Sequence, residues 1–289
     1  MVQETRALGW GRRYMMCPPD HFQVAYAINP WMGGTVDPDR AMAEWQDLVD
    51  TIRSAGGEVE INPAQPGLPD MVFSANAGVV DGSTFIAGRM RHAERVEEVG
   101  HVSNWALHNG FDVQALSDGA LLEGLGDAMP LADAMVVGYG ARSNEIAHAD
   151  LHRLTGREII PVHLADLRWY HVDLTLCPLD DQRAMVFPDA YDAVGAARVL
   201  DRIPEPLVLT EDEASTFAAN SIVVGSTVIM PAAPLRVGRQ LEAWGFDVVV
   251  VEVGEFAKAG GAVRCLTLPL DTQLSVVPST IEPSPLEAA

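Results

Sequence analysis

The stretch "PDRAMAEWQDLVDTIRSAGGEVEI" at residues 38–61 carries the pattern that decides the fold. Its apolar side chains recur at helical spacing, at Met42, Trp45, Leu48, Val49 and Ile52. Gly56 and Gly57 then end the helix, because glycine adopts the left-handed cap conformation at little cost. Val59 and Ile61 alternate as in a short strand. The stretch therefore predicts an amphipathic helix, a glycine break and a strand.

Four further segments repeat this pattern at intervals of about 50 residues, beginning at Arg91, Ser143, Ala190 and Pro234. Between the segments lie pairs of short apolar runs separated by turn residues, such as "NSIVV" and "VIMP". One motif also recurs 144 residues along the chain: "FSAN" at 73–76 leads to "AGVV", and "FAAN" at 217–220 leads to "SIVV". We interpret this recurrence as an internal repeat of structure.

Five units of helix and strands favour a closed ring with α/β layering, in which strands lie inward and helices outward. A doubly wound parallel sheet shows the same alternation and stays as the alternative. No internal linker is evident. We expect one catalytic domain over residues 1–278 and a loose, proline-rich tail over residues 279–289.

The composition excludes several classes of protein. The 289 residues are 48% hydrophobic and carry a net charge of −21, which argues against disorder and against nucleic-acid binding. An acidic surface suits a small cationic ligand, although it also serves solubility. No stretch has the apolar length of a signal or a membrane span, so we expect a cytoplasmic protein with no membrane partner. The three cysteines are far apart and odd in number, which favours reduced thiols.

Polar residues that end apolar runs are the candidates for chemistry, because strand ends converge at the axis of a ring. In "GGAVRCLTL" the alternation predicts a strand with Val263, Cys265 and Thr267 on one face. Cys265 is a candidate nucleophile, although a lone cysteine is more often a small buried apolar residue. Cys17 and Cys177 fit the buried type.

A histidine and three acidic residues are the other candidates. In "RWYHVDLTL" the spacing of His171 and Asp173 predicts one face of a strand, with either an acid–base role or a satisfied core histidine. Glu123 and Asp127 bracket "EGLGD", a turn that either presents carboxylates to a cation or is solvated. The other histidines show no metal-binding spacing.

Seven motifs in order resemble the guanidine-modifying superfamily with the pentein, or α/β-propeller, fold: "MCPPDHF", "INPWM", "PDMVFSANAG", "EGLGDA", "GYGARS", "YHVDLTLCPL" and "EFAKAGGAVRCLTL". The resemblance covers nearly the whole chain and is closest to arginine dihydrolases and dimethylarginine dimethylaminohydrolases. It implies five ββαβ-type units around a central site. It also implies a hydrolase that requires neither a metal nor a cofactor.

By this resemblance Cys265 is the nucleophile, His171 the general acid and base, and Glu123 the carboxylate that orients the histidine. Related deiminases have one residue fewer between the two acidic positions, so the division of labour between Glu123 and Asp127 is open. The implied substrate-binding residues are Asn29, Asp70, Asn76, Arg95, Asp127, Arg142 and Asp173.

The implied reaction is hydrolysis of the guanidinium C–N bond of arginine through a covalent Cys-thiouronium intermediate, with release of ammonia. A deiminase stops at citrulline, whereas a dihydrolase continues to ornithine and CO2, and Asn76 is the residue that we expect to decide between them. Asn76 and Asp173 favour arginine over dimethylarginine. The alternatives are a dimethylarginine dimethylaminohydrolase, which gives citrulline and dimethylamine, and a non-catalytic arginine sensor. Whether the chain forms a homo-oligomer is open.

Overall fold

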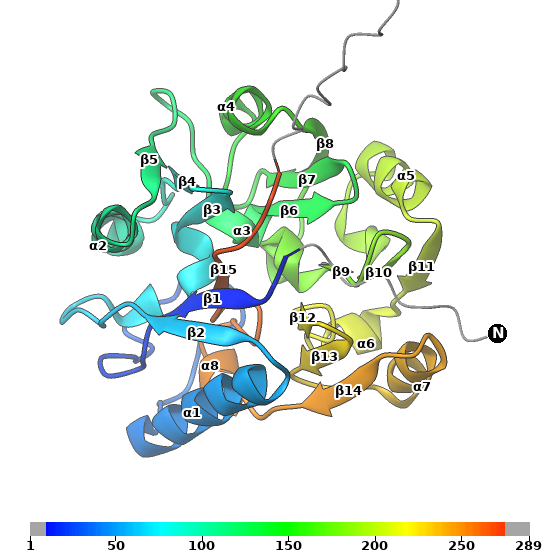
Figure 1. Ribbon diagram of the computed structural model, residues 1–289, viewed down its shortest axis with the longest axis horizontal. Helices are drawn as coiled ribbons and strands as arrows, with labels where there is room; N and C mark the ends of the chain where they lie inside the picture. Colours follow the sequence, from blue (N-terminus) through cyan, green and yellow to red (C-terminus); the bar gives the residue numbers. More distant parts are fainter. Residues whose placement is uncertain (1–9, 275–289) are drawn as a thin grey trace, which may run out of the picture.

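The computed structural model describes residues 10–274 and shows a ring of five small sheets (Figure 1). In each sheet the central strand pairs antiparallel with one neighbour and parallel with the other. The sheets are β15 (Leu268–Pro269), β1 (Arg13–Met16) and β2 (Glu58–Ile61); β3 (Gly78–Asp81), β4 (Thr84–Ala87) and β5 (Asp112–Gln114); β6 (Ala128–Leu131), β7 (Ala134–Tyr139) and β8 (Glu158–His163); β9 (Leu176–Pro178), β10 (Arg183–Val186) and β11 (Glu205–Val208); and β12 (Ile222–Val224), β13 (Thr227–Met230) and β14 (Asp247–Val250).

One longer helix in each unit connects the two parallel strands and lies at the outside of the ring (Figure 1). These helices are α1 (Pro38–Ser54), α2 (Val96–His108), α4 (Ile146–Thr155), α5 (Ala193–Arg202) and α7 (Leu235–Ala243). Shorter helices are α3 (Gly124–Asp127), α6 (Glu211–Ala214) and α8 (Gly254–Ala257). Single 3-10 turns are η1 (Pro69–Val72), η2 (Ser74–Ala77), η3 (Ala93–Arg95), η4 (Leu167–Trp169), η5 (Val172–Leu174) and η6 (Pro188–Ala190).

The ring closes through the pairing of β1 with β15, which places Met15 opposite Leu268. The two ends of the described chain thus complete one unit. No sheet between residues 10 and 274 has more than three strands, so the doubly wound alternative is wrong and the repeated ββαβ pattern is confirmed. No helix in this range is long and apolar enough to cross a membrane. The expected tail over residues 279–289 lies outside the described residues, and the domain extent stays a prediction.

Helix α1 shows how the repeat is specified locally. The Asp37 carboxylate accepts hydrogen bonds from the backbone N–H groups of Asp39 and Arg40, which caps the first turn. The apolar stripe predicted from the sequence is buried, including Trp45 and Leu48, except that Met42 is half-buried. Gly56 has φ +89°, a left-handed conformation that ends the helix before β2.

Two local strand predictions are wrong. Residues 262–267 form a turn, in which the Leu266 N–H donates to the Ala262 carbonyl and the Thr267 N–H to the Arg264 carbonyl. His171 immediately precedes the 3-10 turn η5 and is not part of a strand. Backbone hydrogen bonds within each segment replace sheet pairing, so the alternation of side chains over these residues does not mark two faces of a sheet.

The close packing of the hairpin β3–β4 gives a first prediction. A Cβ atom at Gly78 would lie 2.5 Å from the Ile86 carbonyl oxygen, which the backbone cannot avoid without moving. We expect Gly78→Ala to lower the free energy of unfolding by about 1–3 kcal/mol. Gly238 in α7 is the matched control, because its Cβ would meet its first neighbour at 3.8 Å. There we expect Gly238→Ala to raise the free energy of unfolding by about 0.5–1 kcal/mol. Urea denaturation measures both, and equal stability of the two variants would contradict the argument.

Candidate active site

The candidate site is built from one short turn of each unit. The turns immediately precede the first strand of each hairpin, namely β3, β6, β9, β12 and β15, and these strands lie around the centre of the ring (Figure 1). The buried polar or thiol side chains that they contribute are Asn76, Asp127, Asp173, Asn220 and Cys265. The repeated fold thus delivers one such side chain per unit to the middle of the molecule.

Cys265 lies in a buried network with Asp173 and Asn220. Its Sγ donates to Asp173 Oδ2 at 3.3 Å and accepts from Asn220 Nδ2 at 3.1 Å. Asn220 Oδ1 accepts from the backbone N–H of Cys265, and Asn220 Nδ2 also donates to the Asp173 carbonyl. Burial, together with the charge of Asp173, raises the pKa of the Cys265 thiol well above its usual value, so the thiol is protonated in the free protein.

His171 is held by Glu123. The His171 Nε2 atom lies 2.9 Å from Glu123 Oε2, which also accepts from Arg142 Nη1 at 2.8 Å. Burial alone would raise the pKa of Glu123, but the His171 hydrogen bond and the charge of Arg142 outweigh it and hold this pKa below its usual range. Glu123 is therefore an ionised partner for the imidazole.

Asp127 is placed differently from Glu123. Its Oδ2 accepts from the Ser143 hydroxyl and backbone N–H and lies 4.0 Å from His171 Nε2. Burial raises the pKa of Asp127 to about 6. Of the two carboxylates whose roles the sequence left open, Glu123 is the one in hydrogen-bond contact with His171.

Asp70, Asn76 and Arg95 form a second group. Arg95 Nη1 donates to Asn76 Oδ1 at 2.9 Å, and Arg95 Nε lies 3.9 Å from Asp70 Oδ2. The buried Glu98 pairs with Arg95 at 2.8 Å, and the Tyr26 hydroxyl donates to Asp70 Oδ2 at 2.9 Å. The two groups meet at Gly126, where an added Cβ would lie 2.5 Å from Asn76 Nδ2 and 3.0 Å from His171 Nδ1.

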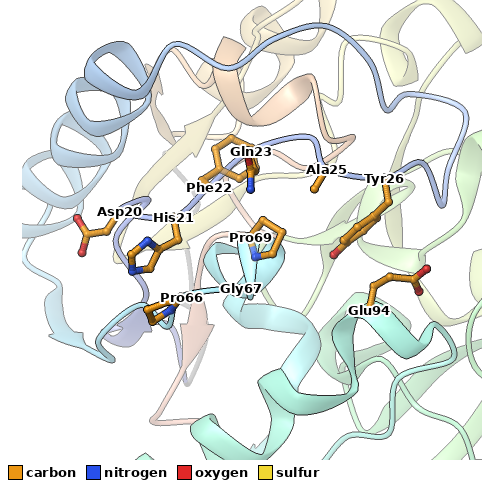
Figure 2. Close-up of a pocket in the computed structure, with 10 residues that line it drawn as sticks. All are labelled: Asp20, His21, Phe22, Gln23, Ala25, Tyr26, Pro66, Gly67, Pro69 and Glu94. Atoms are coloured by element: carbon orange, nitrogen blue, oxygen red, sulfur yellow. The ribbon is translucent and has the colours of Figure 1, made fainter.

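Segment 20–36 has no helix or strand and lies against this group of residues. Its Ile28 carbonyl accepts from Arg142 Nη2 at 3.0 Å. The Asn29 Nδ2 group donates to the Ala259 carbonyl, and Asn29 Oδ1 accepts from the Trp31 N–H in the same segment. Asn29 therefore contacts its own segment and the loop before Cys265 instead of the carboxylates of the site. Beside the segment is a cavity of about 540 Å³ (Figure 2), with Asp20 at one end and Tyr26 and Glu94 at the other. None of the predicted site residues lines this cavity.

Four buried polar atoms of the site have no hydrogen-bond partner among the described residues: Asp70 Oδ1, Asp127 Oδ1, Asp173 Oδ1 and Asn76 Nδ2. An unsatisfied buried polar group costs about 1–3 kcal/mol, so such a cluster needs an explanation. Asp127 Oδ1 lies against Gly138, which leaves Asp70 and Asp173 as the acceptors available to a ligand. Carboxylate oxygens without donors suit a cation that carries several N–H groups.

Three further residues of the site or its surroundings were missed by the sequence reasoning: Asn220, Glu98 and Ser143. Asn220 had a signal, because "FAAN" at 217–220 repeats the motif that ends in Asn76. The other two had none. No group of three or more His, Cys, Asp or Glu residues between 10 and 274 is arranged to hold a metal ion.

Comparison with known proteins places the chain among enzymes. Residues 21–272 match the family model of eukaryotic N,N-dimethylarginine dimethylhydrolases. The chain is 35% identical over 259 residues to the N(G),N(G)-dimethylarginine dimethylaminohydrolase of Mycobacterium tuberculosis, covering 89% of this chain and 85% of that one. It is 37% identical over 263 residues to the bifunctional arginine dihydrolase/ornithine cyclodeaminase ArgZ of Synechocystis, covering 89% of this chain but 37% of ArgZ.

A solved structure supports the same comparison. The N-terminal domain of ArgZ, an arginine dihydrolase, is solved bound to product, and a variant of it is solved covalently bound to a reaction intermediate. Both superpose with a TM-score of 0.88 at 35% identity, covering 91% of this chain and 99% of theirs.

The environment of Asp173 gives a second prediction. Burial, opposed by the Cys265 hydrogen bond, raises the pKa of Asp173 to about 7. When folding raises the pKa of an acidic group, the folded state loses stability as the pH rises from the pKa of the unfolded state to that of the folded state. We therefore expect the stability of Asp173→Asn relative to the parent to be about 1–3 kcal/mol greater at pH 8 than at pH 5. Urea denaturation at both pH values measures it. The exposed Asp189→Asn is the control, and a pH-independent difference for Asp173→Asn would contradict the burial argument.

Proposed function

The chain belongs to the N,N-dimethylarginine dimethylhydrolase family, and from that premise we propose that it hydrolyses free arginine at the guanidinium carbon. It is a hydrolase of guanidino C–N bonds with the pentein fold of its relatives. The observation that carries the choice of site is the buried contact between Cys265 and Asp173, beside carboxylate oxygens that lack donors.

In this proposal Cys265 is the nucleophile and the cationic substrate activates it. The thiol is protonated in the free protein, because its pKa is raised by burial. A positive charge about 4 Å from the sulfur, at an effective dielectric constant of about 20, contributes about 4 kcal/mol to forming the thiolate. That is roughly 3 units of pKa. The bound guanidinium supplies this charge, and the thiol passes its proton to His171 as the substrate arrives.

His171 then transfers the protons of the two half-reactions. The thiolate attacks the guanidinium carbon, the C–N bond breaks, and ammonia leaves with a proton from His171. The thiouronium adduct that remains is attacked by water, which gives up a proton to His171. The C–S bond then breaks and citrulline is released. Glu123 suits this role of His171, because its ionised carboxylate holds the ring in place in both protonation states.

Asp70 and Asp173 favour an unmethylated guanidinium. Each has one buried carboxylate oxygen without a donor among the described residues. Arginine presents N–H groups on every side of its planar cation, whereas two methyl groups remove both donors from one nitrogen. A methylated substrate would leave a buried acceptor unpaired, which costs about 1–3 kcal/mol. We therefore favour arginine over dimethylarginine.

Arg95 and Arg142 are substrate-binding residues by the family resemblance, which implies that they bind the α-carboxylate of the substrate. Arg95 gives most of its donors to Glu98, Asn76 and the Asp70 carbonyl, and Arg142 gives one each to Glu123 and Ile28. Binding of a carboxylate by Arg142 would therefore accompany movement of segment 20–36, since the Ile28 carbonyl takes one of its donors.

Dimethylarginine hydrolysis is the second candidate function, and the family model and the Mycobacterium tuberculosis relative favour it. The identities to this relative and to ArgZ are similar, at 35% and 37%. Self-association of the chain and its location in the cytoplasm also stay predictions.

Analysis of the products tests the proposed function. We expect the protein to release ammonia from arginine, with a kcat/KM at least about tenfold higher than for dimethylarginine, as one unpaired acceptor of about 1.4 kcal/mol implies. Mass spectrometry of the products separates citrulline, ornithine and dimethylamine. Cys265→Ser should abolish turnover. Cys17→Ser removes a buried cysteine outside the proposed contacts and should leave turnover measurable. Faster release of dimethylamine than of ammonia would establish the second candidate instead.

The extent of the reaction gives a further prediction at Asn76. Asn76 Nδ2 is buried without a partner among the described residues, and it lies at Gly126 together with His171. It is therefore placed to contact the groups bonded to the guanidinium carbon. We expect Asn76→Asp to raise the ratio of citrulline to ornithine formed from arginine. Asn62→Asp, at a buried asparagine outside the site, is the matched control. An unchanged product ratio in Asn76→Asp would remove Asn76 from this role.

A further inference from the structure

Arg264 is a buried cation that the proposed reaction does not use. Its side chain is fully buried, and its Nε–H donates to the Ser221 carbonyl at 2.9 Å. Its Nη1 and Nη2 groups have no oxygen or nitrogen acceptor among the described residues. The buried thiol of Cys177 is a neighbour: burial raises the pKa of this thiol, and the charge and hydrogen bond of Arg264 oppose that rise. The guanidinium carbon lies 5.2 Å from the centre of the Trp10 ring, which offers a cation–π contact but no negative charge.

Other buried arginines of the described chain are each paired with a carboxylate. Arg95 contacts Glu98 at 2.8 Å, Arg142 contacts Glu123 at 2.8 Å, and Arg183 contacts Asp180 at 2.5 Å. Arg264 makes no such ion pair. An unpaired buried charge is costly, so its charge must be offset by a group that is not in direct contact.

The backbone of Arg264 is tied to that of the candidate nucleophile. Arg264 directly precedes Cys265 in the chain, and the backbone N–H groups of both donate to Asn220 Oδ1. Asn220 in turn donates to Cys265 Sγ and to the Asp173 carbonyl. The same asparagine thus fixes the base of the Arg264 side chain, the sulfur and the aspartate.

The Asp173–Cys265 pair is the group whose negative charge fits this cation. The two side chains share a hydrogen bond. When the pair has lost one of its two acidic protons, it carries a single negative charge. The charge of Arg264 lowers the pKa of Asp173 against the effect of burial. Two further titratable groups interact with Arg264, namely Tyr14 and Cys177. Three others interact with the pair, namely Asp127, Tyr170 and Tyr191.

We propose that Arg264 is a positioning residue for the reaction, which holds the Asp173–Cys265 pair in its singly negative form through the charge of its buried guanidinium. The proposal rests on the proposed function, because it assigns Cys265 as the nucleophile. Arg264 touches neither substrate nor reacting atoms in this scheme. It makes the negative charge at the sulfur and the carboxylate less costly in a site from which water is excluded.

The test is the pH dependence of alkylation of Cys265 by iodoacetamide, a neutral reagent that reacts with the thiolate and releases iodide. Mass spectrometry of the peptide around Cys265 measures the rate at this residue alone. Loss of the positive charge should make the pair hold its protons to higher pH. We expect Arg264→Gln to raise the midpoint of the pH profile by about one pH unit and to slow alkylation at pH 7 by about fivefold or more. Arg264→Lys keeps the charge and should restore a midpoint close to that of the parent.

Arg183→Gln is the matched control, because it removes a buried arginine that stacks on Trp244 and Phe246 away from the pair. It should lower stability and leave the midpoint unchanged. An unchanged midpoint in Arg264→Gln, or an equal rise in Arg264→Lys, would overturn the proposal. Absence of turnover together with absence of alkylation at Cys265 in the parent would instead count against the proposed function.

A second measurement covers the outcome in which Arg264→Gln does not fold. If the two charges offset each other, removing both should cost less than the sum of the separate losses. We therefore expect the double variant Arg264→Gln/Asp173→Asn to be recovered folded and to be more stable than Arg264→Gln. A double variant that fails to fold, or whose losses in urea denaturation simply add, would show that Arg264 acts through packing alone.

Discussion

The burial of Asp173 beside Cys265 is the interaction on which the chemistry proposed for this protein depends. Both groups lose their hydration, which raises the pKa of each, and the thiol keeps its proton until a compensating charge arrives. A planar cation supplies that charge and fills the acceptors that the protein leaves open. Binding of the cation and activation of the nucleophile are therefore one event in the proposed attack on arginine.

The ring is the arrangement that makes such a site possible. Each unit contributes the turn before its first strand, and closure of the ring between β1 and β15 brings all five turns to the axis. Helices and sheets around the axis leave the side chains of these turns buried. A single turn of this kind at the surface would carry a solvated carboxylate or thiol with ordinary properties, because desolvation requires all the units together.

Charges within the site are balanced in two ways. Glu123 and Glu98 are in direct contact with arginines, which keeps Glu123 ionised and orients His171 and Arg95. Arg264 has no carboxylate in contact. In our proposal its charge stabilises the negative charge of the Asp173–Cys265 pair, and it does not touch the substrate. In addition to this local balance, the net charge of −21 attracts a cationic substrate towards the molecule.

The sequence alone determined the repeated unit, since helical periodicity, glycine breaks and alternating strands are local properties of residues such as Leu48, Gly56 and Val59. The motifs around Cys265, His171 and Glu123 also identified the family. What only the tertiary structure decided is which side chains meet. Asn220 repeats Asn76 in the sequence, yet its contact with Cys265 exists because the ring closes. The turn at residues 262–267, read from its alternation as a strand, takes its shape from contacts with segments far along the chain. Burial and charge balance likewise depend on groups separated by up to hundreds of residues, so no local pattern encodes the pKa of Asp173 or the unpaired cation of Arg264.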